Sequence, residues 1–317
     1  MEASGLETKS ATKKKGKLSP LAAREERAAY LFLLPWILGV IFFLLGPILA
    51  SFALSFTKWN LFSPPEWVGL ANYQKMFHDR DFYNSMGVTL KYMLLSIPLF
   101  SAAALGLSVL LNQKLRGMYV LRTVMFMPSV LAGTAVAVMF SMLLQPDAGI
   151  VNQFLRGIGI ANPPRWLMSE QWAVPAIVLM GLWGIGGGTI IYLAGLQNIP
   201  PTLYEAADID GASAWQKFTR ITLPLLTPTI FFQLITSLAA AFQIFDIAFV
   251  LSGRGARRGA LMFYLLNIYN ESFRESRFGY ASALAWVLVL ISAITILVIN
   301  STSNRWVYYE VDTKGES

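Results

Sequence analysis

Polar side chains that could bind a substrate interrupt an otherwise apolar part of the chain. Asp246 ends a run of 25 residues without charge, Gln243 lies three residues before it, and Gln233 lies ten residues before Gln243. In a continuous helix Gln243 and Asp246 would share one face, where they and an aromatic ring such as Phe242 could hold a sugar. Asn267, before the last apolar run, could line the same path. The structural alternative is that Asp246 caps or pairs at a helix end.

Catalytic residue sets are missing from the chain. Cys is absent and His78 is the only histidine, which excludes disulfides, a Cys/His zinc site, a Cys nucleophile and, unless His78 serves, a Ser-His-Asp triad. There is no Gly-x-x-x-x-Gly-Lys-Ser/Thr phosphate loop, and no carboxylates cluster at metal-ligand spacing. We therefore expect a chain that is not an enzyme, that binds no cofactor or metal of its own, and that depends on a partner if ATP drives it.

Long stretches without charge indicate the fold class. Apolar residues make up 55% of the 317 residues and charged residues 14%, against roughly 25% charged in soluble domains. Six charge-free stretches contain the roughly 20 apolar residues that a helix needs to cross a bilayer. The sequence therefore predicts an all-α integral membrane protein with six transmembrane helices, near residues 31–56, 92–111, 124–144, 173–196, 229–250 and 280–299.

The distribution of Lys and Arg predicts the orientation in the membrane. The N-terminal tail, residues 1–30, holds seven of these residues, which are enriched on the cytoplasmic side. With six helices both termini then lie in the cytoplasm, around a transmembrane domain at 31–306 and a C-terminal tail at 307–317. The lysines at 13–17 are expected to attract anionic membrane lipid rather than nucleic acid, since no aromatic residues are interleaved for base stacking.

The cytoplasmic loop at residues 197–224, between the fourth and fifth helices, carries signals for two short helices. Two prolines end the fourth span, and Thr202 and Glu205 have the spacing of a capping box. Gly211 fits the left-handed position that follows a short helix. These signals predict the first arm of a helix–turn–helix elbow along the membrane surface.

The second arm is predicted to start immediately afterwards. Ser213 and Gln216 repeat the capping-box spacing, and Pro224 is expected to end the helix at the membrane. Asp208 and Asp210 offer charges to a basic partner surface, and neighbouring alanines keep part of the elbow thin. The simpler alternative is an ordinary surface loop.

The same loop resembles the EAA signature of binding-protein-dependent ABC importer permeases. The matching residues are Glu205-Ala206-Ala207, then Gly211 after three residues, then Ile221-x-Leu223-Pro224 after nine more. The chain from about residue 31 to 306 is similar to the sugar-permease branch related to the maltose permeases. Supporting stretches are 33–35 with 46–47, 69–73, 149–152 and 242–253.

The resemblance implies both partners and residue roles. The elbow would be the coupling helix region that docks on an ABC ATPase, through Glu205, Ala206, Ala207, Asp208, Gly211, Leu223 and Pro224. The assembly would contain a second homologous permease subunit, two ATPase subunits that bind ATP-Mg, and an extracytoplasmic substrate-binding protein, in a bacterial inner membrane. The expected cargo is a carbohydrate, and more narrowly an oligosaccharide.

The loop at 251–259 is unusually basic for its predicted outer location. Arg254, Arg257 and Arg258 favour an anionic cargo, such as a uronic-acid oligosaccharide or a glycerophosphate, because guanidinium groups pair with carboxylate and phosphate. Two alternatives are contact with an acidic lobe of the binding protein and pairing with Glu271 and Glu275. A different class, an ion-coupled secondary transporter, would use intramembrane carboxylates.

Overall fold

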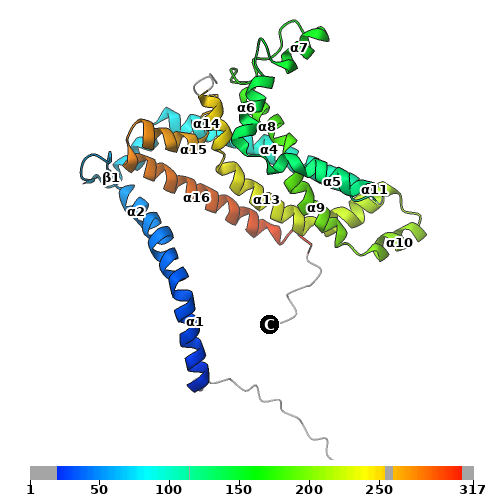
Figure 1. Ribbon diagram of the computed structural model, residues 1–317, viewed down its shortest axis with the longest axis horizontal. Coiled ribbons are helices and arrows are strands. Elements are labelled where there is room, and N and C mark those ends of the chain that lie inside the picture. The colour runs from blue at the N-terminus through cyan, green and yellow to red at the C-terminus, as the bar shows by residue number, and fades with distance from the viewer. Residues whose placement is uncertain (1–19, 114, 254–259, 309–317) are drawn as a thin grey trace, which may run out of the picture. The chain divides into compact units, whose positions relative to one another are not determined.

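The computed structural model describes residues 20–113, 115–253 and 260–308, and most of them are helical (Figure 1). The predicted all-α class is confirmed. Short antiparallel strands β1 (Thr57–Lys58) and β2 (Glu66–Trp67) form the one sheet in the described ranges. The helices are α1 (Pro20–Gly39), η1 (Val40–Leu45), α2 (Gly46–Leu54), α3 (Ala71–Met76), α4 (Arg80–Leu111), α5 (Met118–Phe126), η2 (Met127–Val130), α6 (Gly133–Leu143), α7 (Ile150–Gly157), α8 (Ala173–Trp183), α9 (Gly186–Gln197), α10 (Pro201–Ile209), α11 (Ala214–Lys217), η3 (Phe218–Thr222), α12 (Leu223–Leu225), α13 (Thr227–Phe242), α14 (Asp246–Ser252), α15 (Tyr264–Tyr269), η4 (Asn270–Arg274) and α16 (Phe278–Ser303).

Four helical stretches are long and apolar enough to cross a membrane, and two bent pairs of helices qualify together. The four are Ala28–Leu54, Arg80–Leu111, Thr227–Ser252 and Phe278–Ser303. The pairs are Met118–Val130 with Gly133–Leu143, bent by 92°, and Ala173–Trp183 with Gly186–Gln197, bent by 53°. The described residues thus contain four spans, or up to six if each bent pair is one span. The predicted number of six is the upper limit of this range.

Among the described residues, 20–53 form one compact unit, which contains α1, η1 and most of α2. Helix α1 begins at Pro20, so the predicted tail, residues 1–30, already contains its first turns. The physical reason is composition, because residues 20–30 are rich in Ala, Glu and Arg, which favour helix even though four residues of this stretch are charged. The apolar window within Ala28–Leu54 has no buried residue, as expected for a helix that meets lipid or a partner.

In the second unit, residues 54–317, α4 is the central element and packs against α8, α9, α13 and α15. Asp79 precedes the helix, and its carboxylate accepts a hydrogen bond from the Asp81 backbone at 2.9 Å. The 32 residues of α4 give a length of about 48 Å, more than the roughly 30 Å of a bilayer core. The predicted span at 92–111 therefore covers only the charge-free part of a longer helix.

Two buried clusters surround α4 and join it to the later helices. One contains Ile177 of α8, Ala248 of α14 and Phe263. The other contains Met93 of α4, Tyr264 of α15 and Leu284 of α16. Because Phe263 and Tyr264 are neighbours in the chain, the start of α15 anchors both clusters.

Glycines in the fourth predicted span serve two different purposes. Gly184 lies in the break between α8 and α9, where the pair bends by 53°. Gly186, at the start of α9, permits a close crossing, because an added Cβ would lie 2.5 Å from the Met125 carbonyl oxygen. Gly184 therefore permits the bend, and Gly186 permits the close packing of α9.

The hairpin β1–β2 and α3 lie at the start of α16 (Figure 1). Thr57 pairs with Trp67, and Lys58 pairs with Glu66. Helix α16 approaches this hairpin at Gly279, where an added Cβ would overlap the carbonyl oxygen of Thr57. The glycine is therefore required for the backbones to lie this close.

Candidate coupling elbow and substrate path

The first arm of the elbow is α10, which begins two residues earlier than the capping-box prediction requires. Pro200 is the N-cap residue, Pro201 is the first helical residue, and no side chain caps the helix. The predicted Thr202–Glu205 box is therefore wrong. Proline fits the first turn without losing a helical hydrogen bond, so the two prolines start the helix themselves. Gly211 has φ = +71°, which confirms its predicted left-handed position after the helix.

The second arm starts with the predicted capping box. The Ser213 hydroxyl accepts from the Gln216 backbone at 3.3 Å, and the Gln216 side chain accepts from the Ser213 backbone at 2.7 Å. Helices α11, η3 and α12 then follow one another without a break. The prediction that Pro224 ends this arm is wrong, because Pro224 lies inside α12, within the first turn that tolerates proline. Leu226 is the one residue between α12 and α13.

Two contacts tie the arms of the elbow together. The Lys217 ammonium lies 2.6 Å from a carboxylate oxygen of Asp208, and the hydroxyl groups of Tyr204 and Thr222 are 2.9 Å apart. The Lys217–Asp208 pair is partly exposed, so it adds little free energy but restricts the angle between the arms. An elbow held in this way can transmit a push on α10 to α13.

The predicted coupling residues divide into an outer and an inner set. Glu205, Ala206, Asp208 and Gly211 are exposed, and Ala207 is half-buried. The inner set is Leu223 and Pro224, which are half-buried at the entry to α13. The outer set is accessible at the surface, and the inner set lies where the elbow joins the span.

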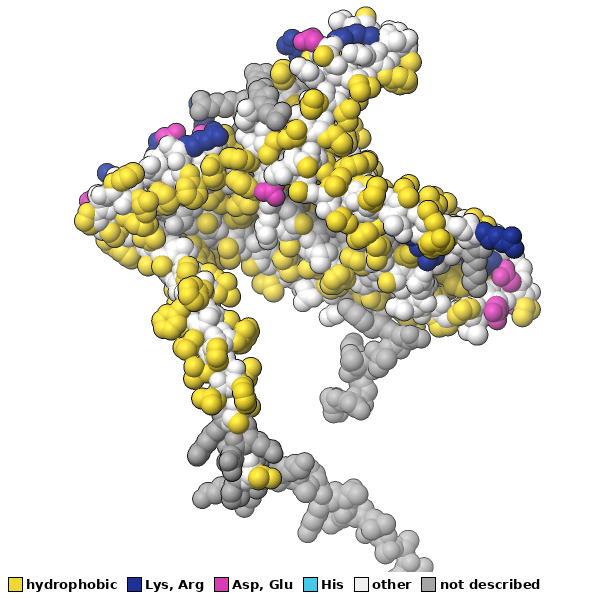
Figure 2. All heavy atoms as spheres, in the orientation of Figure 1, with side chains coloured by type: hydrophobic (Ala, Val, Ile, Leu, Met, Phe, Trp, Pro, Cys, Tyr) yellow, Lys and Arg dark blue, Asp and Glu magenta, His cyan; other side chains and the backbone are white. Residues whose placement is uncertain are grey.

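Sequence reasoning missed the apolar side chains at the tip of the elbow. Ile209 is 88% exposed, Trp215 is 71% exposed, and Leu203 is also exposed. Figure 2 shows charged side chains gathered over the same end, around α10 and α11. Large apolar groups surrounded by charge are typical of an interface with another protein. The only signal in the sequence was a pair of large apolar residues beside charged ones in a loop with two capped helices.

The fifth span is broken at the residues predicted to bind cargo. Helix α13 ends at Phe242, Gln243 follows it, and α14 begins at Asp246. The predicted shared helical face of Gln243 and Asp246 is therefore wrong, because the backbone leaves the helix between them. Both side chains are nevertheless exposed at the break. Sixteen residues of α13 place this break about 24 Å along the span, where polar groups are costly unless a partner or water meets them.

Gln233 lies deeper in the helix packing. Its amide nitrogen is 3.3 Å from the Ser237 hydroxyl, and it approaches Gly188 of α9. Its amide oxygen is buried and has no hydrogen-bond partner among the described residues. A buried oxygen without a hydrogen bond costs free energy. A donor for Gln233 would therefore come from a bound water or from a different conformation of its neighbours.

Asn267 does not line an open surface. Its side chain is 2% exposed, and its amide donates to the Ser85 hydroxyl at 3.3 Å. The residue therefore holds α15 against α4, and we do not retain it among the path residues. Arg254, Arg257 and Arg258 lie outside the described residues. Within these residues Glu271 and Glu275 both pair with Arg277, at 3.1 Å and 3.3 Å.

The fold changes the protonation of the Glu271 carboxylate, which lies between α15 and α16. Its side chain is only 10% exposed, and this burial raises the pKa of Glu271 above its ordinary value. The charges of Arg277 and Lys75 oppose the shift. No group of three or more His, Cys, Asp or Glu in the described part of the chain could hold a metal ion.

The chain belongs to the family described as binding-protein-dependent transport system inner membrane component, whose model matches residues 92–309. It is therefore a membrane component of a transporter and not itself an enzyme. This assignment confirms the family that the loop at 197–224 indicated.

Relatives of known name cover nearly the whole chain. The probable ABC transporter permease protein YesP of Bacillus subtilis (strain 168) is 38% identical over 290 residues, which are 90% of this chain and 94% of YesP. The trehalose/maltose transport system permease protein MalF of Thermococcus litoralis is 34% identical over 89% of this chain and 96% of MalF. The arabinooligosaccharides transport system permease protein AraP of Bacillus subtilis (strain 168) is 30% identical over 86% of this chain and 88% of AraP.

The fold also matches solved structures. A chain of a bacterial ABC transporter involved in the import of the acidic polysaccharide alginate superposes with a TM-score of 0.80 and 26% identity, over 89% of this chain and 96% of that chain. A second match, with a TM-score of 0.79 and 25% identity, is a bacterial alginate ABC transporter in complex with alginate pentasaccharide-bound periplasmic protein. The arrangement of helices is therefore that of an importer subunit.

Proposed function

We propose that this chain is a membrane-spanning subunit of an ATP-driven importer for an oligosaccharide. The observation that carries the proposal is the elbow of α10 and α11, which contains the EAA signature, joins directly to the span with Gln243 and Asp246, and exposes Ile209 and Trp215. Relatives named for the transport of trehalose, maltose and arabinooligosaccharides support a carbohydrate cargo.

The assembly follows from what this chain lacks and exposes. We propose that a second, homologous permease subunit completes the path, because Gln243 and Asp246 are exposed on this chain. Two ATPase subunits that hold ATP-Mg would bind the elbow from the cytoplasm, where both termini would also lie. A substrate-binding protein would deliver cargo on the other side, and the complex of the alginate transporter with an alginate pentasaccharide-bound periplasmic protein supports this partner. Membrane lipid would cover the remaining apolar surface.

In this mechanism the elbow is the moving part. ATP binding would bring the two ATPases together and displace α10. The Lys217–Asp208 and Tyr204–Thr222 contacts would carry the movement to α12 and α13. The path would then open outward to receive the cargo, and hydrolysis would return it to the inward-open state.

An acidic oligosaccharide is the more specific cargo that we propose. Arg254, Arg257 and Arg258 would attract carboxylates of a uronic-acid chain, and two structural neighbours belong to importers of the acidic polysaccharide alginate. A glycerophosphate is the other anionic cargo that this loop would favour. Reversing the three charges to Glu should lower uptake of alginate oligosaccharides and leave uptake of neutral malto-oligosaccharides unchanged. Equal uptake of the acidic series before and after the change would refute the acidic cargo.

The assembly itself is tested by purification. Tagged chain, extracted from its native membranes in mild detergent, should bring with it a P-loop ATPase and a second permease subunit, identified by mass spectrometry. Ala206→Trp, on the exposed face of α10, should release the ATPase and retain the second permease. A chain that purifies alone, with uptake abolished by a protonophore, would instead indicate an ion-coupled transporter that uses Asp246.

A further inference from the structure

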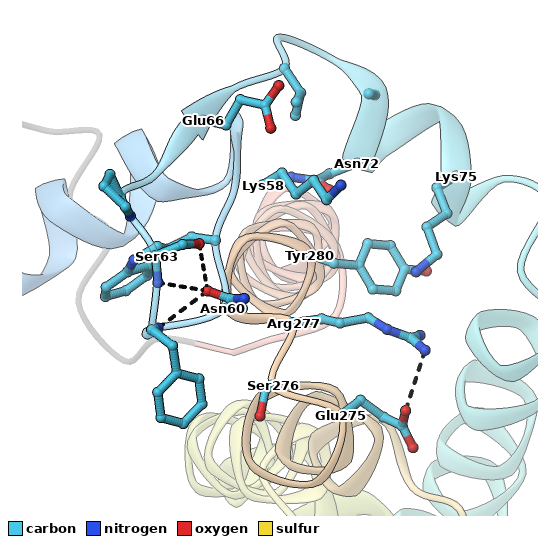
Figure 3. Close-up of a pocket in the computed structure, with 15 residues that line it drawn as sticks. Lys58, Asn60, Ser63, Glu66, Asn72, Lys75, Glu275, Ser276, Arg277 and Tyr280 are labelled. Carbon is cyan, nitrogen blue, oxygen red and sulfur yellow. Dashed lines mark hydrogen bonds and ion pairs between the residues drawn. The ribbon is translucent and has the colours of Figure 1, made fainter.

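A cavity of about 760 Å³ lies between the β1–β2 hairpin, α3 and the start of α16 (Figure 3). Cavities of this size are typical of sites for small organic ligands. It lies outside the predicted path residues Gln233, Gln243 and Asp246, none of which lines it. The coupling elbow and the break in the fifth span do not explain this cavity.

The lining of this outer pocket combines flat rings with many hydrogen-bonding groups. The rings are Trp59, Phe62 and Tyr280, and the amides are Asn60 and Asn72. Serine hydroxyl groups and side chains of both charges complete the wall. A saccharide presents apolar C–H faces and a dense rim of hydroxyl groups, which rings and mixed donors and acceptors can meet together.

Several polar side chains of the pocket are held in place by neighbouring groups. Arg277 pairs with Glu275 at 3.3 Å, as Figure 3 shows, and Lys75 lies 3.9 Å from the centre of the Tyr280 ring. The Tyr280 hydroxyl donates to Asp79 at 2.6 Å. Because these groups are already ordered, a ligand would lose little binding energy in fixing them.

Strained backbone is concentrated at the same pocket. Within the described residues the non-glycine residues with positive φ are Leu61, at 71°, and Ser276, at 53°. Leu61 lies in the hairpin loop, where the Asn60 side-chain oxygen accepts hydrogen bonds from the backbone N–H groups of Phe62 and Ser63 and from the Ser63 hydroxyl. Ser276 lines the opposite wall. Strain of this kind is concentrated in proteins at functional sites, which favours a binding role over a gap in the packing.

A continuous series of aromatic contacts connects this pocket to the break in the fifth span. Neighbouring rings in the series have centroids 5.1–5.7 Å apart. The series runs from Trp59 in the pocket through Phe278, Phe273, Tyr269 and Phe249 to Phe245. Phe245 lies between Gln243 and Asp246, and Phe273 is 66% exposed. Rings that stay partly exposed along such a line offer successive stacking surfaces to a chain of sugar units.

We infer that the outer pocket is a receiving site for the oligosaccharide and that the aromatic series guides it toward Gln243 and Asp246. The inference rests on the proposed function, because it assigns the first stop on the path of the same cargo. The site would take the leading sugar units when the binding protein opens, and it would prevent their return before the path closes. A docked side chain of the binding protein is the alternative occupant, and the experiment below separates the two.

The experiment uses the complete transporter with its binding protein in lipid vesicles. The variants are Trp59→Ala, in the pocket, and Phe273→Ala, whose exposed ring should not be needed for folding. The matched control is Trp67→Ala, because Trp67 is in the same hairpin, is 69% exposed, stacks on Phe56 and does not line the pocket. The probes are alginate and malto-oligosaccharides of two to six units, and the readout is the number of saccharide molecules imported per ATP hydrolysed.

Both variants should reduce import per ATP by roughly fivefold for the six-unit probe, with a smaller effect for the two-unit probe, because a longer chain contacts more rings. ATP hydrolysis stimulated by the loaded binding protein should remain at the wild-type rate, and Trp67→Ala should behave as wild type. A parallel fall of hydrolysis and import would show that the pocket binds the binding protein and would overturn the inference. An unchanged ratio in both variants would overturn it as well. If the wild-type transporter imports neither probe series nor any sugar of a mixed polysaccharide hydrolysate, the proposed function itself is wrong.

Discussion

Substitution of Ile209 tests the proposed role of the elbow most directly. The side chain is 88% exposed at the end of α10, so Ile209→Ala should change the stability of the chain itself by less than about 0.5 kcal/mol. If an ATPase groove buries this side chain, the substitution removes three buried carbon atoms, worth about 0.8 kcal/mol each. The expected loss of about 2 kcal/mol corresponds to a roughly thirtyfold higher Kd.

The assay is a titration of the ATPase subunit onto immobilised permease in detergent. The matched control is Ile158→Ala, because Ile158 is also exposed, at 61%, but follows α7 on the predicted outer side. We expect an unchanged Kd for the control and a faster dissociation for Ile209→Ala. Wild-type affinity for Ile209→Ala would refute the reasoning that the apolar tip of the elbow is the contact.

Three further predictions concern stability, path and pH. Gly279→Ala should destabilise the chain by about 3 kcal/mol, because the added Cβ would overlap the backbone of Thr57. Thermal unfolding in detergent measures this loss. Gly87→Ala is the control, because no described atom lies within 4 Å of its added Cβ. Gln243→Ala should lower uptake at least severalfold while the complex still assembles, as size-exclusion chromatography would show, and normal uptake would remove Gln243 from the path. Because the pKa of Glu271 is raised in the folded state, its protonated form stabilises the folded state below pH 4.5, and this contribution is lost as pH rises through the folded pKa. The difference in unfolding midpoint between wild type and Glu271→Gln should therefore fall as pH rises from 4 to 7. A constant difference would contradict this prediction.

Local signals were read correctly where one segment determines its own conformation. The Ser213 capping box and the left-handed Gly211 depend on four or five adjacent residues, and both are present in the structure. The error at Thr202 also has a local cause. Two prolines compete with the capping box for the helix start, and their fixed φ angle decides the outcome.

Errors in the path residues have a different cause. Helical periodicity assumes an unbroken helix, but the fifth span leaves the helix after Phe242 and resumes at Asp246. Asn267 was read as exposed because it stands in a loop between spans, and it is buried because Ser85 of α4 lies beside it. Neither the break nor the burial is encoded by the residues nearby.

The sequence by itself determined the membrane class, the family and two local signals of the elbow, at Gly211 and Ser213. Each depends on composition or on spacing within one segment, because the cost of charge in lipid and the geometry of helix caps act locally. Only the tertiary structure decided which polar groups are exposed and which are buried. The contact between Trp59 and Phe278, which are more than 200 residues apart in the chain, also exists only in the folded protein. The physical reason is that packing depends on surfaces that meet only after the helices have assembled, so the outer pocket and the aromatic series have no signature in any single stretch of the chain.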